Sequence, residues 1–160
     1  MRAAATVPTA SRGYDGGKKV SGRKRHIVTD TLGLLMVVAV TAANIGDRDA
    51  TVGLLTRLRR LHRDITLVWA DGGYPGGLVD WCRSKLALTL QIVKRTDDVQ
   101  GFVVLPRRWV AERTFAWLMN SRRLAHDYET LPATSEAMIR WSMVTRMGRP
   151  LARPRAAGRR

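Results

Sequence analysis

Apolar and polar positions alternate along this chain in two periods, one typical of strands and one typical of helices. Short runs rich in β-branched residues predict four strands, at 25–30, 34–41, 65–70 and 88–93. Apolar residues that recur every three or four positions predict helices, at 52–61, 78–86, 107–124 and 135–147. The order strand, strand, helix, strand, helix, strand, helix indicates a mixed α/β fold.

Two of these segments allow a more detailed prediction. The run 34–41 is apolar at successive positions, so we expect both faces of this strand to be buried. In the helix at 52–61 the apolar face is formed by Val52, Leu55, Leu58 and Leu61, and arginines occupy the positions between them. The turn between the first two strands falls at 31–33, which places them in a β-hairpin.

The strand at 65–70 carries the first candidate functional residue. It reads as a buried strand, with Trp69 in the core, and it ends at Asp71, which two glycines follow directly. Glycines allow the backbone to come close to a group that the carboxylate holds. A second acid, Glu112, lies in the helix that begins near Pro106. If this helix is continuous, Arg108, Met119 and Arg123 share one stripe with Glu112.

The charge balance points to a polyanionic partner. The chain has 28 Lys+Arg against 13 Asp+Glu, a formal net charge of +15, and nucleic acid is the commonest partner of such a chain. A second interpretation is that arginine serves as an ordinary surface residue in an arginine-rich proteome. Two separated carboxylates on so basic a chain predict metal-dependent chemistry on nucleic acid.

Smaller features narrow the class of protein. The single cysteine, Cys82, excludes an internal disulfide and a cysteine zinc site. Three histidines lie too far apart in the sequence to suggest a metal cluster. The longest apolar run, 32–43, is too short to span a bilayer. With no apolar signal core at the N-terminus, we expect a cytoplasmic protein.

The domain organisation follows from composition. Residues 1–17 are predicted to be a loop or frayed leader, and 18–145 one domain. The tail 146–160 is basic and contains no acid, so we expect it to be disordered. The cationic run Lys18–His26 is predicted at the lip of the hairpin, where the alternative is a solvated loop.

Five stretches of the chain closely resemble bacterial insertion-sequence DDE transposases of the insertion-sequence-4-like or 5-like group. They are Gly13–Val20, Gly22–His26, Asp30–Gly33, Trp69–Tyr74 and Gly101–Trp117. The resemblance covers roughly residues 2–145. It implies a ribonuclease-H-like mixed sheet flanked by helices, in which three acids bind two divalent ions, Mg²⁺ or Mn²⁺. It also implies double-stranded DNA as substrate, both transposon ends and target, and a homo-oligomer on that DNA.

The resemblance assigns roles to particular residues. Asp71 matches the second catalytic Asp of the family and Glu112 the catalytic Glu, so both are expected to be metal ligands. Met119 replaces a family Lys or Arg, a role that Arg122 or Arg123, one turn on, could take over. Trp109 and Trp117 are expected to pack, with base stacking as the alternative for Trp109. The residues expected to hold DNA phosphates are Lys18, Lys19, Arg23, Lys24, Arg25, Arg107, Arg108, Arg113 and Arg123.

The largest departure from the family pattern concerns its first catalytic Asp. In relatives this residue lies on the first strand, just before the segment that matches Arg2, so the chain is expected to lack that strand. Asp15 and Asp30 occupy other family positions and are predicted to serve turns. A decayed element, a late start codon and a frameshifted second frame all fit this pattern.

Two functional hypotheses follow. The first is metal-dependent cleavage and strand transfer of insertion-sequence ends by a DDE transposase that is incomplete or inactive. The second is a non-catalytic DNA-binding remnant of such an enzyme. A structural RNA-binding protein would account for the charge but not for the paired acids.

Overall fold

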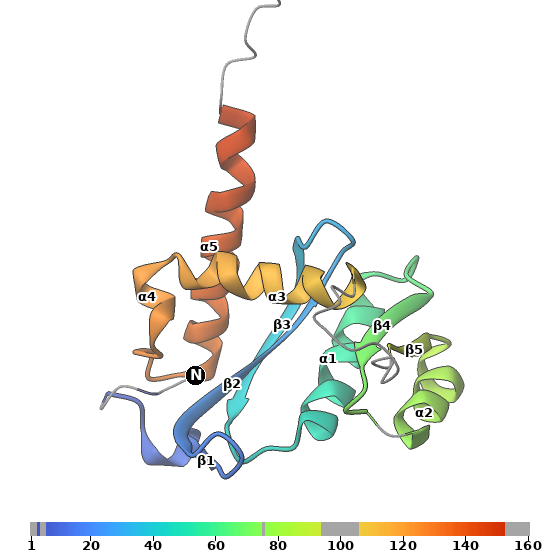
Figure 1. Ribbon diagram of the computed structural model, residues 1–160, viewed down its shortest axis with the longest axis horizontal. Coiled ribbons are helices and arrows are strands. Elements are labelled where there is room, and N and C mark those ends of the chain that lie inside the picture. The colour runs from blue at the N-terminus through green and yellow to red at the C-terminus, as the bar shows by residue number, and fades with distance from the viewer. Residues whose placement is uncertain (1–2, 4–5, 75, 94–105, 153–160) are drawn as a thin grey trace, which may run out of the picture.

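The structure is a computed structural model that describes residues 3, 6–74, 76–93 and 106–152, with side chains described for all of these except 106–108 and 149–152. Strands in this part of the chain form two separate sheets, one of three strands and one of two (Figure 1). Helices lie between the sheets and over their faces.

The larger sheet is antiparallel. Its strands are β1 (Gly13–Asp15), β2 (Val20–Thr29) and β3 (Leu35–Ala42), in that spatial order, after a short 3-10 turn, η1 (Thr9–Ser11). The start of β2 pairs with β1, and its longer remainder pairs with β3 from Arg23↔Ala42 to Thr29↔Leu35. The register shifts once, between Val28 and Thr29. The predicted hairpin is therefore confirmed, and β2 is longer than expected.

The smaller sheet is a parallel pair. It consists of β4 (Leu67–Asp71) and β5 (Thr89–Val93), joined by α2 (Gly76–Leu86). Parallel strands need such a crossover because the chain must return to the same end of the sheet. The register places Asp71 opposite Val93, so Asp71 is the last paired residue of β4.

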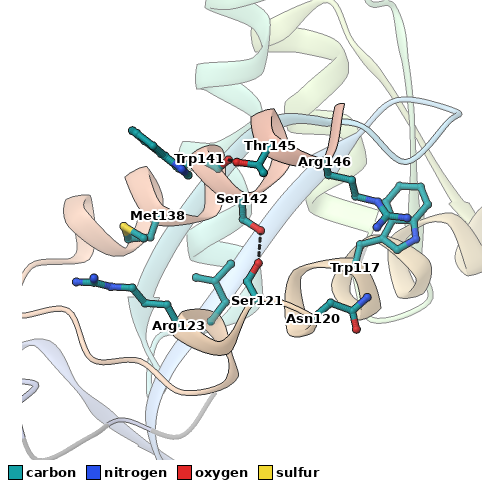
Figure 2. Close-up of a pocket in the computed structure, with 10 residues that line it drawn as sticks. Trp117, Asn120, Ser121, Arg123, Met138, Trp141, Ser142, Thr145 and Arg146 are labelled. Atoms are coloured by element: carbon teal, nitrogen blue, oxygen red, sulfur yellow. Dashed lines mark hydrogen bonds between the residues drawn. The ribbon is translucent and has the colours of Figure 1, made fainter. Parts of the chain in front are cut away.

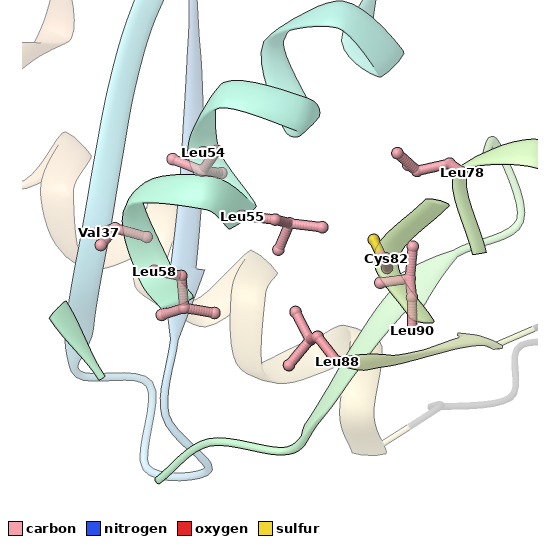
Figure 3. Close-up of a cluster of buried hydrophobic side chains, with 8 residues drawn as sticks. All are labelled: Val37, Leu54, Leu55, Leu58, Leu78, Cys82, Leu88 and Leu90. Atoms are coloured by element: carbon pink, nitrogen blue, oxygen red, sulfur yellow. The ribbon is translucent and has the colours of Figure 1, made fainter. Parts of the chain in front are cut away.

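Helix α1 (Asp47–Leu61) lies between the two sheets and supplies the centre of the first hydrophobic core (Figure 3). Its Leu54, Leu55 and Leu58 are buried. On one side they meet Val37 of β3. On the other side the cluster is completed by Leu78, Cys82, Leu88 and Leu90, from α2, β5 and the segment between them. One helix thus holds both sheets together by burial of apolar surface.

A second core lies on the opposite face of β2 and β3. It is covered by α3 (Pro106–Met119), α4 (Arg122–Ala125) and α5 (Pro132–Ala152). Val38 and Val40 of β3 pack there against Leu118, Leu124, Ile139 and Met143. Because Val37 enters the first core and Val38 the second, β3 is buried on both faces, as its continuous apolar run predicts.

The hairpin tip docks on α3 through a glycine. Gly33 has φ +82°, a backbone conformation that a side chain disfavours. A Cβ there would lie 2.9 Å from Thr114 Oγ1. The buried Thr114 hydroxyl donates to the Gly33 carbonyl at 2.7 Å. This contact requires a residue without a side chain, and it fixes the hairpin tip against α3.

The arrangement confirms the mixed α/β class and is consistent with a ribonuclease-H-like transposase fold. Helix α1 packs against strands of both sheets, and α3 contacts both β2 and β4. Over 24–29, β2 has a strand partner on one edge only, and so does β4. In the described residues β2 and β4 therefore belong to separate sheets, and α3 contacts both strands.

Several predicted details need correction. Leu61 is 55% exposed, and Leu54 takes its place on the buried face of α1. The helix expected over 107–124 is broken, because α3 ends at Met119 and α4 begins at Arg122. Strand β4 is half-exposed rather than buried, and Trp69 is 37% exposed on its open face.

The two chain ends also differ from expectation. The supposed leader contains β1, and Val7 within it is buried. The supposed tail begins inside α5, which extends to Ala152 and projects from the body of the molecule (Figure 1). Residues 153–160 lie outside the described part. Among the described helices, none has the length and apolar character needed to cross a membrane.

Leu58→Ala tests whether α1 holds the two sheets together. Leu58 is fully buried, so we expect the free energy of unfolding to fall by about 2–5 kcal/mol in urea titrations. Leu61→Ala, three residues further along the same helix, is the matched control. Its side chain is mostly exposed, so its cost should stay within about 0.5 kcal/mol. Equal costs for the two variants would contradict this assignment of the core.

Candidate catalytic and nucleic-acid site

Asp71 stands exposed at the end of β4. Its side chain is exposed, and Gly73 N donates to Asp71 Oδ1 at a long 3.4 Å. A Cβ on Gly72 would meet nothing within 4 Å, and one on Gly73 would make only ordinary contact. The two glycines are therefore not required by packing, but they keep the approach to the carboxylate clear of side chains.

Tyr74 anchors the turn that follows Asp71. Its side chain packs against the first core. Burial raises the pKa of Tyr74, while a hydrogen bond with Thr51 of α1 lowers it. The packing of this side chain fastens the glycine turn to the first core. Asp71 is consequently carried between a paired strand and an anchored turn, which restricts the position of its carboxylate.

The second acid lies on α3, a helix that contacts β4. Glu112 is exposed in the middle of this helix. The fold therefore brings the elements that carry Asp71 and Glu112 into contact from more than 40 positions apart in the sequence. Carboxylate oxygens are ligands that Mg²⁺ and Mn²⁺ prefer. The described residues contain no group of three His, Cys, Asp or Glu side chains able to hold a metal ion.

Asp15 and Asp30 are committed to turns, as predicted. Asp15 Oδ1 accepts hydrogen bonds from the backbone of Gly17 and Lys18, both at 3.0 Å. Those bonds help lower the pKa of Asp15. Asp30 Oδ1 accepts from the backbone of Leu32 and Leu34 at 2.9 and 2.8 Å. Each carboxylate shapes its own loop, the structural role that aspartate commonly takes in turns.

Arg23 is a structural residue and not a DNA contact, which corrects its predicted role. It is fully buried, and its Nη1 lies 3.2 Å from Asp127 Oδ2. Its five N–H donors are all satisfied. Their acceptors are that carboxylate, the Ser11 hydroxyl and the carbonyls of Ser11, Glu129 and Thr130. No donor remains for phosphate.

The other cations of the run Lys18–His26 differ in how accessible their charged groups are to a ligand. Lys18 and Lys19 are exposed in the turn between β1 and β2. Lys24 is paired with Asp47 at 3.1 Å. Arg25 is half-buried, and its Nε and Nη2 lie out of solvent without a hydrogen-bond partner. Burial lowers the pKa of Arg25, and the nearby charge of Asp127 opposes that shift. The predicted basic lip is thus partly interior.

The predicted cations of the helical segment fall into three groups. Arg113 lies against Trp109 and Trp117, and its Nη2 donates to the Leu32 carbonyl at 2.8 Å. Arg123 lies on α4, so it does not continue the α3 stripe, and it pairs with Glu129 at 2.9 Å. The side chains of Arg107 and Arg108 lie outside the described residues.

The sequence did not predict a functional role for two further residues, Arg146 and Trp141. Arg146 stacks over Trp117, and Trp141 projects from α5 with 74% of its surface exposed (Figure 2). The spacing of Trp109, Arg113 and Trp117 by four positions is a visible signal for one helical stripe. Nothing in the sequence pairs Arg146 with that stripe, because it belongs to a different helix.

Comparison with known proteins identifies the class. The family model described as Transposase DDE domain matches residues 1–147, so the chain belongs to the DDE transposase family. A protein of Burkholderia cepacia described as a candidate transposase for insertion sequence element IS402 is 30% identical over 115 residues. That match covers 68% of this chain and 54% of the relative, so the chain spans about half of the relative's length. No solved structure matches.

Asp127→Asn tests the structural role of the buried pair. The substitution leaves the Arg23 charge buried without its counter-ion, so we expect a loss of about 3–5 kcal/mol in unfolding free energy. Glu129→Gln breaks the pair with Arg123, whose side chain is 63% exposed, and should cost at most about 1 kcal/mol. Urea unfolding measures both. An Asp127→Asn cost no larger than that of Glu129→Gln would contradict the assignment.

Proposed function

We propose that this chain acts in DNA transposition, in the metal-dependent cleavage and strand transfer of insertion-sequence ends. The observation that carries the proposal is the pair Asp71 and Glu112. Both are exposed, on elements in contact, in a chain that belongs to the DDE transposase family. The net charge of +15 favours DNA as the partner. The proposal includes a cytoplasmic location, because the resemblance is to bacterial proteins, whose DNA lies in the cytoplasm.

The two carboxylates suit divalent metal ions. Mg²⁺ or Mn²⁺ held there would supply Lewis-acid chemistry, activating water and stabilising charge on phosphoryl oxygens. Asp71 has a restricted position at the strand end, so it provides the fixed ligand. Glu112 approaches from α3, whose contacts with β4 and the docked hairpin tip fix the helix. The resemblance adds two ions and a homo-oligomer on DNA to this proposal.

We further propose that these residues form an incomplete site. The family uses three acids, whereas the described part of the chain offers no third acid grouped with Asp71 and Glu112. Asp15 and Asp30 serve their own turns. A misplaced reacting group can cost ~100-fold in rate, so little strand transfer is expected from this chain alone. The second candidate, a non-catalytic DNA-binding remnant, is favoured by the same observation.

The proposed DNA contacts follow the exposure of the cations. Accessible side chains can hold backbone phosphates, which position DNA without reading its sequence. Arg23 is excluded by burial, and Arg25 can offer only the part of its guanidinium that reaches solvent. The remaining proposed contacts among the described side chains are Lys18, Lys19, Lys24, Arg113 and Arg123. Arg107 and Arg108, whose side chains lie outside the described residues, are proposed from the family resemblance alone.

Manganese binding tests the pair of acids without requiring catalysis. We expect Asp71→Asn and Glu112→Gln each to weaken Mn²⁺ binding at least about tenfold, or ~1.4 kcal/mol. Each variant removes one anionic oxygen donor. The measurement is the paramagnetic resonance signal of free Mn²⁺ in a titration. Asp80→Asn, an exposed acid on α2, is the matched control and should bind like the original chain. Unchanged binding in the two site variants would refute the metal assignment.

DNA cleavage tests whether the site formed by Asp71 and Glu112 is complete. Short labelled duplexes are incubated with the chain and Mg²⁺ or Mn²⁺, and products are separated on a denaturing gel. We expect salt-sensitive binding with little or no joined product. Metal-dependent product that disappears in Asp71→Asn and Glu112→Gln but persists in Asp80→Asn would mean that the chain supplies its own third ligand. The incomplete-site proposal would then be wrong and the catalytic one strengthened.

A further inference from the structure

Tryptophan and arginine side chains alternate in one stack that crosses from α3 to α5. The Arg113 guanidinium carbon lies 4.4 Å from the ring centroid of Trp109 and 4.9 Å from that of Trp117. Arg146 lies 4.0 Å from the Trp117 centroid. These distances are within the range of cation–π attraction. We refer to Trp109, Arg113, Trp117 and Arg146 as the Trp–Arg stack.

The stack is held on both sides. At one end Arg113 donates to the Leu32 carbonyl, so the docked hairpin tip supports it. At the other end the hydroxyls of Ser121 and Ser142 lie 2.6 Å apart and join the segment after α3 to α5 (Figure 2). Trp117 itself packs against the second core. The Arg146 guanidinium therefore rests on an aromatic ring that is itself held in place by packing.

The charge of Arg146 is not compensated within the described part of the chain. Other arginines near α5 have acids: Arg140 and Arg57 share Glu136, at 2.8 and 3.0 Å. In the same part of the chain, no Asp or Glu lies within ion-pair distance of Arg146. A guanidinium stacked by one face keeps its N–H edge available for a planar, two-point contact with an anion.

A small pocket opens beside Arg146. Its volume is about 200 Å³, and it lies between the end of α3, α4 and α5 (Figure 2). Polar side chains of Asn120, Ser121 and Ser142 line it together with Arg146, and the exposed Trp141 forms part of its far wall. Typical cofactor and drug-sized sites are larger, roughly 300–1,000 Å³. The size and the hydroxyl and amide lining fit one sugar-phosphate unit.

We propose that the Trp–Arg stack is a phosphate-binding element for DNA, in which Arg146 contacts one backbone phosphate at the mouth of this pocket. Trp117 is a positioning residue that holds the Arg146 guanidinium flat. This inference rests on the proposed function, because it takes DNA as the partner. It adds a contact on α5, a helix to which the family resemblance gave no role.

The slope of DNA affinity against salt tests the contact. Each phosphate neutralised on duplex DNA contributes about 0.9 to the slope of log affinity against log salt concentration. We expect Arg146→Gln to lower the magnitude of the slope by about 0.9 and to weaken binding. Arg146→Lys keeps the charge but not the flat fork, so it should keep the slope with weaker binding. Arg140→Gln, whose charge Glu136 already compensates, is the matched control and should leave both unchanged.

Trp117→Phe tests the positioning role. Phenylalanine keeps an aromatic face with weaker attraction for a cation, so we expect several-fold weaker binding with the original slope. Thermal unfolding of each variant is recorded in parallel. Lower melting temperatures with unchanged affinity and slope in Arg146→Gln would make the stack a helix clamp only and overturn the inference. A chain that shows no salt-sensitive DNA binding at all would instead refute the proposed function.

Discussion

The buried ion pair between Arg23 and Asp127 joins parts of the chain that are far apart in sequence. Arg23 of β2 is surrounded by acceptors from η1 and from the loop before α5, and Asp127 also accepts from Ser135 in α5 at 3.0 Å. Because a buried charge is costly unless every donor is satisfied, this set of bonds tolerates few arrangements. It fixes where α5 begins, and the position of Arg146 depends on that starting point.

The region around Asp71 obeys a different constraint. A two-stranded sheet cannot bury both of its faces against a single helix, so β4 keeps one side packed on α1 and α2 and leaves Leu67, Trp69 and Asp71 on the other. The residue that the proposed chemistry needs is thereby presented to solvent by the same alternation that anchors the strand. Trp69 donates to Gln91 of β5 at 2.9 Å, which closes the pair on this open side.

The positively charged side chains differ in whether an acid within the protein already compensates their charge. Arg23 is buried in an ion pair with Asp127, and Lys24 is paired with Asp47. Arg57 and Arg140 share Glu136. Lys18, Lys19 and Arg146 remain without an acid partner in the described residues. A net charge of +15 therefore overstates the charge available to DNA. The cations that remain include those of the β1–β2 turn and Arg146, and others lie on α1 and α2, such as Arg60 and Arg83.

From the sequence alone one could predict the types of the elements between β2 and β5, the hairpin, the double-sided burial of β3, the turn roles of Asp15 and Asp30, and the family. Each of these depends on local periodicity, on turn chemistry or on long matching motifs. Only the tertiary structure decided that Arg23 is interior, that Leu61 faces water, that α3 ends at Met119 and that Arg146 stacks on Trp117. These outcomes depend on which distant surfaces meet, and a linear pattern of side chains does not contain that information.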